Sequence, residues 1–199
     1  MSQTSLHEED VGLMRQALRQ VWPLSDEDLA ALLDHTTRLV LDKGQVLLQA
    51  GQHARLTGFV LQGGLREYYV LEDGTERTKG FNMPGEFAGS LSDLLSGQPS
   101  RVWITAEAPT VLAVTPWPAY EALTHQSPAW MQFARRIAEA LYLLKTEREF
   151  ELLTMDAAQR LARALVRWPA LASTYSQKDI ASYIGVTPVH LSRLRSGKA

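Results

Sequence analysis

Residues 177–194, QKDIASYIGVTPVHLSRL, carry the side chains best suited to contact another macromolecule. On a helix, the end of this segment would expose small, polar and basic groups: Val189, His190, Ser192, Arg193 and, just beyond it, Arg195. Arginine and serine hydrogen-bond the base edges of DNA in the major groove, and basic side chains neutralise its phosphates. The segment therefore predicts a DNA-binding surface.

The spacing within this segment is that of a helix-turn-helix. Gly185 occupies the turn, where a positive φ is wanted, and Ala181 is small where two helices approach. Thr187 can cap the second helix, and Pro188 suits its first position. Apolar residues fall where the helices bury their facing sides: Ile180, Ile184, Val186, Leu191 and Leu194. An ordinary helical hairpin is the alternative, which the turn and cap residues disfavour.

The charge distribution agrees with a DNA-binding role for the C-terminal segment. Residues 160–199 contain seven basic residues and one acidic residue, a net charge of +6. Because the net charge of the whole chain is −2, the preceding 159 residues carry a net charge of −8. Such an asymmetry favours a polyanionic partner for the basic part. Ser192 and Arg193 are expected to read bases. Phosphate contacts are expected from five residues: Lys178, Thr187, His190, Arg195 and Lys198.

The composition narrows the class of protein. Without cysteine, the chain has no disulfide, no cysteine-ligated iron–sulfur cluster and no thiol redox sensor. It contains no P-loop, nucleophile elbow or metal-spaced histidine motif, so an enzyme is disfavoured and no metal site is expected. The N-terminus is polar and acidic, and no apolar run approaches the length of a membrane span. A cytoplasmic protein without a membrane partner is expected.

The elements that would position these residues follow from the rest of the chain. Two short helices are expected between residues 8 and 34, where Ser25 and Asp28 form a capping pair. From about residue 36 to 118, short apolar runs alternate with glycine-containing turns, and Asp73-Gly74 is typical of a tight hairpin. This texture predicts a compact antiparallel β-roll or barrel.

Residues 127–153 predict one long helix, because they contain no glycine and have proline only near the start. Apolar residues recur along it at alternating four- and three-residue steps: Trp130, Ala134, Ile137, Leu141 and Leu144. This spacing favours a two-fold dimer seam over packing within one chain. The expected division is residues 1–126 for the N-terminal helices and β-roll, 127–153 for the dimerisation helix, and 154–199 for the helix-turn-helix domain.

This order of elements resembles the Crp/Fnr family of bacterial transcription regulators over essentially the whole chain. Two passages carry the match, FNMPGEFAGSLSDLLSGQPSRVWITAEAPTVLAV and QKDIASYIGVTPVHLSRLR. The resemblance implies an α+β fold: an N-terminal antiparallel β-roll of the cyclic-nucleotide-binding type, a long dimerisation helix and a C-terminal helix-turn-helix domain. The wing of that domain is expected to be reduced or absent, because few residues follow Leu194.

The resemblance also implies partners. It implies a homodimer that binds double-stranded DNA sequence-specifically, with RNA polymerase as a further partner. Val189 stands where many members have a base-contacting glutamate, and valine can instead pack on a thymine methyl group. The operator is therefore expected to differ from the one that those members read.

The resemblance places an effector pocket at Gly85, Glu86, Phe87, Ser100 and Arg101. Members that bind cyclic AMP pair a Gly-Glu with a later Arg-Ser, but here Ser100 stands where the phosphate-binding arginine belongs. Arg101 follows one step along, where a strand turns its side chain to the other face. Because an unpaired phosphate is costly to bury, neither a cofactor nor dependence on cyclic AMP is expected. Glu86 could equally be a turn carboxylate that bonds local amides.

Two other functions stay open from the sequence. One is a regulator that responds to a cyclic nucleotide or another small ligand. The other is an effector-binding module whose output is protein binding rather than DNA binding, against which the basic second helix argues.

Overall fold

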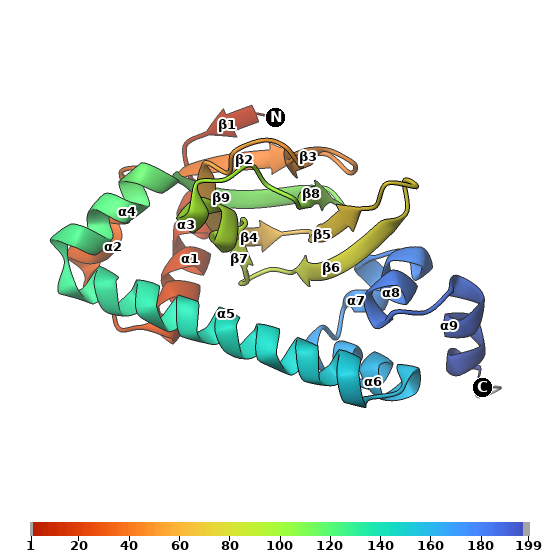
Figure 1. The fold of residues 1–199 in the computed structure, drawn as a ribbon. Coiled ribbons are helices and arrows are strands. Elements are labelled where there is room, and N and C mark those ends of the chain that lie inside the picture. The colour runs from red at the N-terminus through yellow and green to blue at the C-terminus, as the bar shows by residue number, and fades with distance from the viewer. Residues whose placement is uncertain (1, 197–199) are drawn as a thin grey trace.

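In the computed structural model, which describes residues 2–196, two antiparallel sheets pack against each other and form a β-roll (Figure 1). The strand order is β1-β2-β9-β4-β7 in one sheet and β3-β8-β5-β6 in the other. The strands are β1 (Ser2–Thr4), β2 (Thr37–Leu41), β3 (Val46–Leu48), β4 (Leu56–Gln62), β5 (Leu65–Val70), β6 (Glu76–Asn82), β7 (Phe87–Ala88), β8 (Trp103–Ala106) and β9 (Thr110–Pro116). Both sheets contribute to one apolar core, which confirms the predicted β-roll.

Glycine is required at two places in this roll. A Cβ on Gly58 would lie 2.0 Å from the carbonyl oxygen of Ala113, so only glycine lets β4 and β9 approach so closely. Gly74 has a φ of +79° in the turn between β5 and β6, where Asp73 Oδ1 accepts a hydrogen bond from Thr75 N at 2.8 Å. The predicted Asp73-Gly74 hairpin is confirmed.

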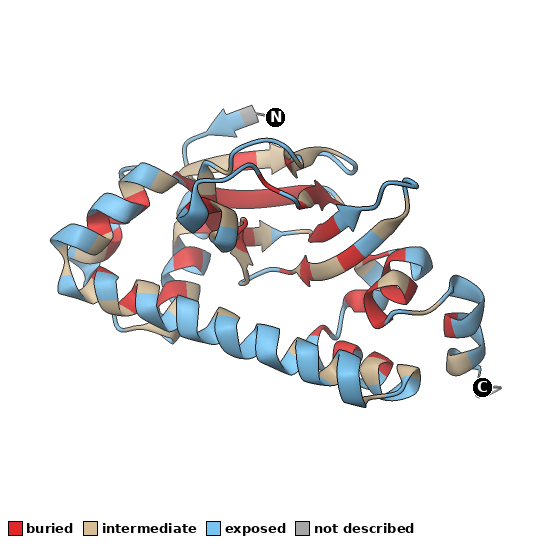
Figure 2. Ribbon diagram, viewed as in Figure 1, coloured by how far each residue is buried: buried red, intermediate tan, exposed pale blue. Residues whose placement is uncertain are grey.

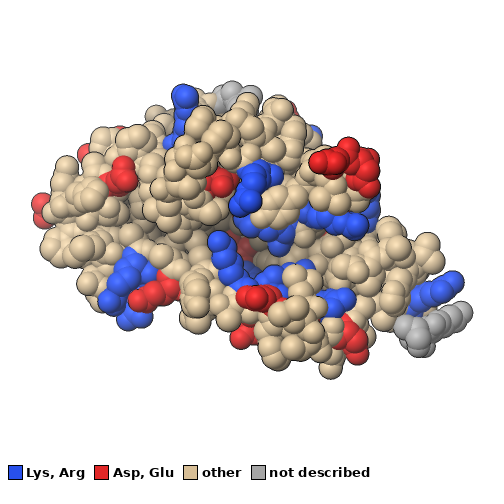
Figure 3. Space-filling model, in the orientation of Figure 1, with Lys and Arg blue, Asp and Glu red and all other residues tan. Residues whose placement is uncertain are grey.

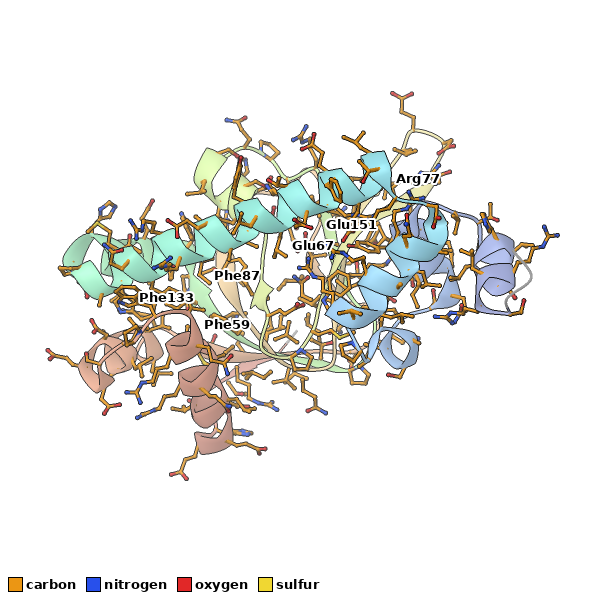
Figure 4. The ribbon with its side chains drawn as sticks, turned by 90° about the horizontal axis from the view of Figure 1, so that it is seen from below. Phe59, Glu67, Arg77, Phe87, Phe133 and Glu151 are labelled. Atoms are coloured by element: carbon orange, nitrogen blue, oxygen red, sulfur yellow. The ribbon has the colours of Figure 1, made fainter. Side chains whose placement is uncertain are left out.

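Helices cover the first sheet on one side. They are α1 (Glu8–Val21), α2 (Asp26–Leu33), α4 (Trp117–Gln126) and the start of α5 (Pro128–Thr154), while α3 (Leu91–Ser96) lies between β7 and β8 in the chain. Ser25 caps α2 as predicted, since its Oγ accepts a hydrogen bond from Asp28 N at 3.0 Å. Trp130 and Phe133 of α5 share a core with Phe59 of β4 (Figure 4).

Helix α5 is continuous over 27 residues, close to the predicted range. At 1.5 Å per residue it is roughly 40 Å long. Ser127 caps its N-terminus and Pro128 occupies the first position, where a missing N–H costs nothing. The helix runs from the N-terminal helices past the β-roll to α6 (Figure 1). None of the helices between residues 2 and 196 is long and apolar enough to cross a membrane.

The C-terminal helices do not bury their core alone. They are α6 (Ala157–Arg167), α7 (Leu171–Thr174), α8 (Gln177–Ile184) and α9 (Pro188–Arg195). Their apolar cluster also contains Phe81 of β6 and Met83, which follows that strand. Figure 2 shows buried residues on both sides of this junction. No strand follows α9 up to residue 196, and the division into three separate domains stays a prediction.

Candidate nucleic-acid interface and cavities

Helices α8 and α9 form the predicted helix-turn-helix. Gly185 lies between them with a φ of +77°, in the left-handed region. Thr187 Oγ accepts a hydrogen bond from His190 N at 3.2 Å, and Pro188 holds the first position of α9. The predicted facing residues Ile180, Ile184 and Leu191 are buried, and Val186 and Leu194 pack at the edge of the same cluster. The local prediction is therefore confirmed in its turn, cap and core.

Helix α9 exposes the residues predicted to contact DNA. The exposed fraction of Val189 is 64%, whereas Leu191 is fully buried. Lys178 on α8 is exposed too, with Nζ 4.0 Å from Glu76 Oε2. The other exposed members of the set are Thr187, His190, Ser192, Arg193 and Arg195. Lys198 lies outside the described residues. The contacts of these side chains with bases and phosphates stay predictions.

Helix α8 is docked on the β-roll by polar contacts that the sequence did not predict. Asp179 is buried and its Oδ1 lies 3.0 Å from Nη1 of Arg66 on β5. Ser182 Oγ accepts a hydrogen bond from Thr78 N on β6 at 2.9 Å. Arg66 pairs with two further carboxylates, those of Glu76 at 2.6 Å and Glu107 at 2.9 Å. Burial alone would lower the pKa of Arg66, but these acidic neighbours raise it, so the guanidinium stays charged at the junction.

Aromatic rings complete the same junction. The ring centre of Phe81 lies 4.2 Å from that of Tyr175 and 5.4 Å from those of Trp168 and Tyr183. Trp168 Nε1 donates a hydrogen bond to Glu86 Oε1 at 3.0 Å. Helical periodicity indicates that these aromatic residues face inward, but it carries no signal for the strand that covers them.

The residues predicted to form an effector pocket are not brought together around one cavity. Gly85 faces a small cavity beside α1, whereas Phe87 faces another beside α5. Glu86 accepts a hydrogen bond from Met83 N at 2.8 Å in addition to that from Trp168. Burial raises the pKa of Glu86, and these hydrogen bonds offset only part of the effect. The interpretation of Glu86 as a turn carboxylate is confirmed, and its contact with Trp168 adds a role between the β-roll and the C-terminal helices.

The other two predicted pocket residues point different ways. Ser100 is buried, and its Oγ donates to Asp93 Oδ2 at 2.6 Å and accepts from Val102 N at 2.9 Å. Arg101 is exposed, as expected for a residue one step along from a buried one. Neither side chain lines either of the two larger cavities described below. Ser100 therefore serves the local backbone and Asp93.

Two cavities of ligand size adjoin the β-roll. One, of 390 Å³, opens beside β3 and β4, where the basic residues His53 and Arg55 are exposed. The larger, of 490 Å³, lies between β6, α3, α5 and the C-terminal helices. Its lining includes four basic residues: Lys79, Lys145, Arg148 and Arg167. Figure 3 shows Lys and Arg side chains gathered around a hollow between the β-roll and the helices below it.

An ion pair occupies the β-roll wall of the larger cavity. Lys79 Nζ lies 2.5 Å from Glu67 Oε2. Burial would lower the pKa of Lys79, but the charge of Glu67 and the hydrogen bond to it raise that pKa. Figure 4 shows Glu67 between the sheet and α5. No group of three His, Asp or Glu side chains that could hold a metal ion occurs in the described part of the chain.

The N-terminal part of the predicted dimer seam packs within its own chain, and the pairing of the seam with a second copy stays a prediction. Trp130 is fully buried, and its Nε1 donates to Asp28 O at 3.2 Å. The remaining seam residues pack on the same core or line the larger cavity: Ala134, Ile137, Leu141 and Leu144. Four-and-three spacing identifies one side of a helix, but it does not say whether that side meets its own β-roll or a second copy.

A second stripe with the same kind of spacing is exposed on α5. Its members follow at steps of seven, four, three, four and three residues: Met131, Ala138, Tyr142, Lys145, Glu149 and Leu152. We call this set the outer stripe; its members Ala138, Tyr142 and Lys145 also line the larger cavity. The exposed fractions of Met131, Tyr142 and Leu152 are 54%, 69% and 50%. Large apolar side chains exposed in one line along a helix are typical of a helix-pairing surface.

The fold and site define a class of protein, a cyclic-nucleotide-binding-type β-roll joined by a long helix to a helix-turn-helix. Residues 38–127 match the family described as the cyclic nucleotide-binding domain. The "Fumarate and nitrate reduction regulatory protein" of Vibrio cholerae is 25% identical over 170 residues, which cover 77% of this chain. The "cAMP-activated global transcriptional regulator CRP" of Pasteurella multocida is 24% identical over 162 residues, which cover 80% of this chain and 77% of that protein.

Solved structures agree on the fold. FixK2 from Bradyrhizobium japonicum superposes with a TM-score of 0.70 at 24% identity, over 81% of this chain and 83% of that one. Over most of its length the chain is similar to regulators of the Crp/Fnr family. It spans 65% of the length of the Vibrio cholerae protein that it matches.

Proposed function

We propose that the chain is a sequence-specific DNA-binding transcription regulator of the Crp/Fnr type that acts as a homodimer. The observation that carries the proposal is α9, a capped helix that displays Ser192 and Arg193 while Leu191 anchors its other side in the core. A helix of this kind fits the major groove, where arginine can pair with O6 and N7 of guanine. The names of the curated relatives agree with regulation of transcription. The proposal assigns the chain no enzymatic activity.

The outer stripe supports the homodimer. Parallel pairing of two α5 helices about a two-fold axis places both copies of α9 at the same end of the dimer. Half-sites of the operator then lie about one turn of DNA apart, roughly 34–36 Å. RNA polymerase is a further proposed partner, which the chain would contact if it activates transcription.

The experiment selects bound sequences from genomic fragments and then measures affinity for the selected site. Arg193→Ala is expected to cost about 1–3 kcal/mol there and to relax the preference at one base pair. Lys178→Ala is expected to weaken binding to all DNA alike and to lower the salt slope by about one unit. Arg15→Ala, which changes an exposed arginine on α1, is the control and should alter neither. Unchanged affinity and base preference in Arg193→Ala would exclude α9 as the reading element.

The proposal includes DNA binding without cyclic AMP. The hydroxyl of Ser100 is engaged by Asp93, and Arg101 is exposed, so neither offers a buried cation to a cyclic phosphate. A missing charge-assisted contact is worth roughly 1.5–3 kcal/mol, or about 10- to 150-fold in affinity. Calorimetric titration with cyclic AMP and cyclic GMP, beside operator affinity with and without each, tests this. Tight nucleotide binding that also strengthens operator binding would overturn it.

A second candidate function is a response to a different anionic ligand, and the larger cavity favours it. Four basic residues line that cavity, against the single carboxylate of Glu67. Trp168 and Tyr183 of the C-terminal helices line it together with β6 and α5, so an occupant would touch both sides of the junction. A thermal-shift comparison of small aromatic carboxylates on the native protein and Arg167→Ala tests it. A stabilising carboxylate whose effect Arg167→Ala abolishes supports this function. An identical response in both proteins would place the ligand elsewhere.

A further inference from the structure

The outer stripe is interrupted by two opposite charges at its centre. Lys145 and Glu149 follow Tyr142 and precede Leu152, and both are exposed. Apolar residues flank them on either side along the helix, so the stripe is apolar at its ends and polar in the middle. Polar residues at seam positions cost stability, and their best-attested use is to specify register and partner.

These two charges are left without partners in their own chain. In the part of the chain that the structure describes, neither Lys145 nor Glu149 forms an ion pair. The charges elsewhere on the helix do pair: Arg135 and Arg136 with Glu139, Arg148 with Glu151, and Glu147 and Glu151 with Arg163 of α6. On α5, the charges of Glu149 and of Lys145, which also lines the larger cavity, are therefore available for a second copy.

We propose that Lys145 and Glu149 form two reciprocal ion pairs across the homodimer seam and select a second copy of this chain as the partner. The inference rests on the homodimer proposed above. In a parallel, in-register pair, Lys145 lies one layer from Glu149 of the partner subunit, an axial offset of roughly 6 Å that two long side chains span. The two-fold axis repeats the contact, so the charge pattern is complementary to itself.

The first test measures dimerisation by sedimentation. Lys145→Glu places four carboxylates at the centre of the seam, and Glu149→Lys places four ammonium groups there. Each single variant is expected to raise the dissociation constant of the homodimer about 10- to 100-fold, through lost pairs and like-charge repulsion. The double variant K145E/E149K restores complementarity and is expected to dimerise like the native protein.

Mixing the two single variants gives the sharpest result. One chain then carries two acidic seam residues and the other two basic ones, so the mixture is expected to form heterodimers that native mass spectrometry resolves from homodimers. Ala140→Glu and Ala140→Lys add the same charges at an exposed position off the stripe and should leave dimerisation unchanged. Statistical mixing of the two single variants, or equal weakening by the Ala140 variants, would overturn the inference.

Orientation is tested separately, because the chain has no cysteine of its own. Met131→Cys places two thiols together only in a parallel, in-register pair and is expected to give a disulfide-linked dimer under mild oxidation. Leu143→Cys, exposed off the stripe, should remain unlinked. A native protein that sediments as a monomer would refute the proposed homodimer itself. If the native protein is a dimer and the charge changes leave its dissociation constant unchanged, only the proposed ion pairs would be refuted.

Discussion

Phe81→Ala removes the ring with which the β-roll enters the core of the C-terminal helices. That ring is 3% exposed and contacts Trp168, Tyr175 and Tyr183, with ring centres 4.2–5.4 Å away. Truncating a buried phenylalanine costs about 3–5 kcal/mol, and aromatic pairs contribute roughly 0.5–1.5 kcal/mol each within that loss. At 2–4 °C per kcal/mol for a chain of this size, the midpoint of thermal unfolding should fall by roughly 6–20 °C.

The control is Phe59→Ala, which empties a similar volume in the core under the N-terminal helices. Both variants should lose comparable global stability. Hydrogen exchange should distinguish the two variants, because only Phe81→Ala weakens the packing of α8 on the β-roll and lowers the exchange protection of the amides of residues 175–184. Equal loss of protection there in both variants would mean that the C-terminal helices do not depend on β6 for their core. The reasoning about a shared junction would then fail.

Two further predictions concern the outer stripe and Glu86. Tyr142→Glu on the outer stripe should weaken the dimer about 30-fold or more in sedimentation, since an interface anchor is worth about 2 kcal/mol. Leu141→Glu should instead destabilise the protomer. If Leu141→Glu alone gave a monomer, the dimer seam predicted from the sequence would be the interface. Glu86→Gln should flatten the pH dependence of urea unfolding. Burial raises the pKa of Glu86 in the folded state above its ordinary 4.5, so its contribution to stability is present below that value and is lost as pH rises through the folded pKa. A difference between native protein and variant that stays constant from pH 4.5 to neutrality would refute this.

Features with local causes were predictable from the sequence. The turn at Gly185, the caps at Ser25 and Thr187 and the hairpin at Gly74 each depend on residues within a few positions, and each occurs as predicted. Backbone sterics and short-range hydrogen bonds act the same way in any fold, so their signatures survive without knowledge of tertiary contacts.

Features with long-range causes were not predictable in the same way. The helical stripe that contains Trp130 was assigned to a dimer, and its N-terminal part packs in the core of its own chain, because periodicity does not specify which neighbour a helix face contacts. The Gly85-Glu86 pair was compatible with a pocket or a turn. Gly85 has a φ of +87° and Glu86 accepts a hydrogen bond from the amide of Met83, so the pair forms a turn, and its place in an effector pocket stays a prediction. A turn and a ligand site use the same residue types, and the sequence carries no signal for the long-range contact of Glu86 with Trp168.

In the proposed homodimer, helix α5 would connect dimerisation with DNA reading. The side that faces its own chain carries Arg148, which lies 3.8 Å over the ring of Tyr183 and donates a hydrogen bond to the carbonyl oxygen of that residue on α8. The adjoining side carries the outer stripe, of which Ala138, Tyr142 and Lys145 reach the larger cavity. In the proposed homodimer, the distance between the two α9 helices would depend on where the stripe pairs and on how Arg148 holds α8, because Tyr183 and α9 share one packed cluster. The larger cavity lies against both Arg148 and Tyr183, so an occupant would act on the contact that fixes this spacing.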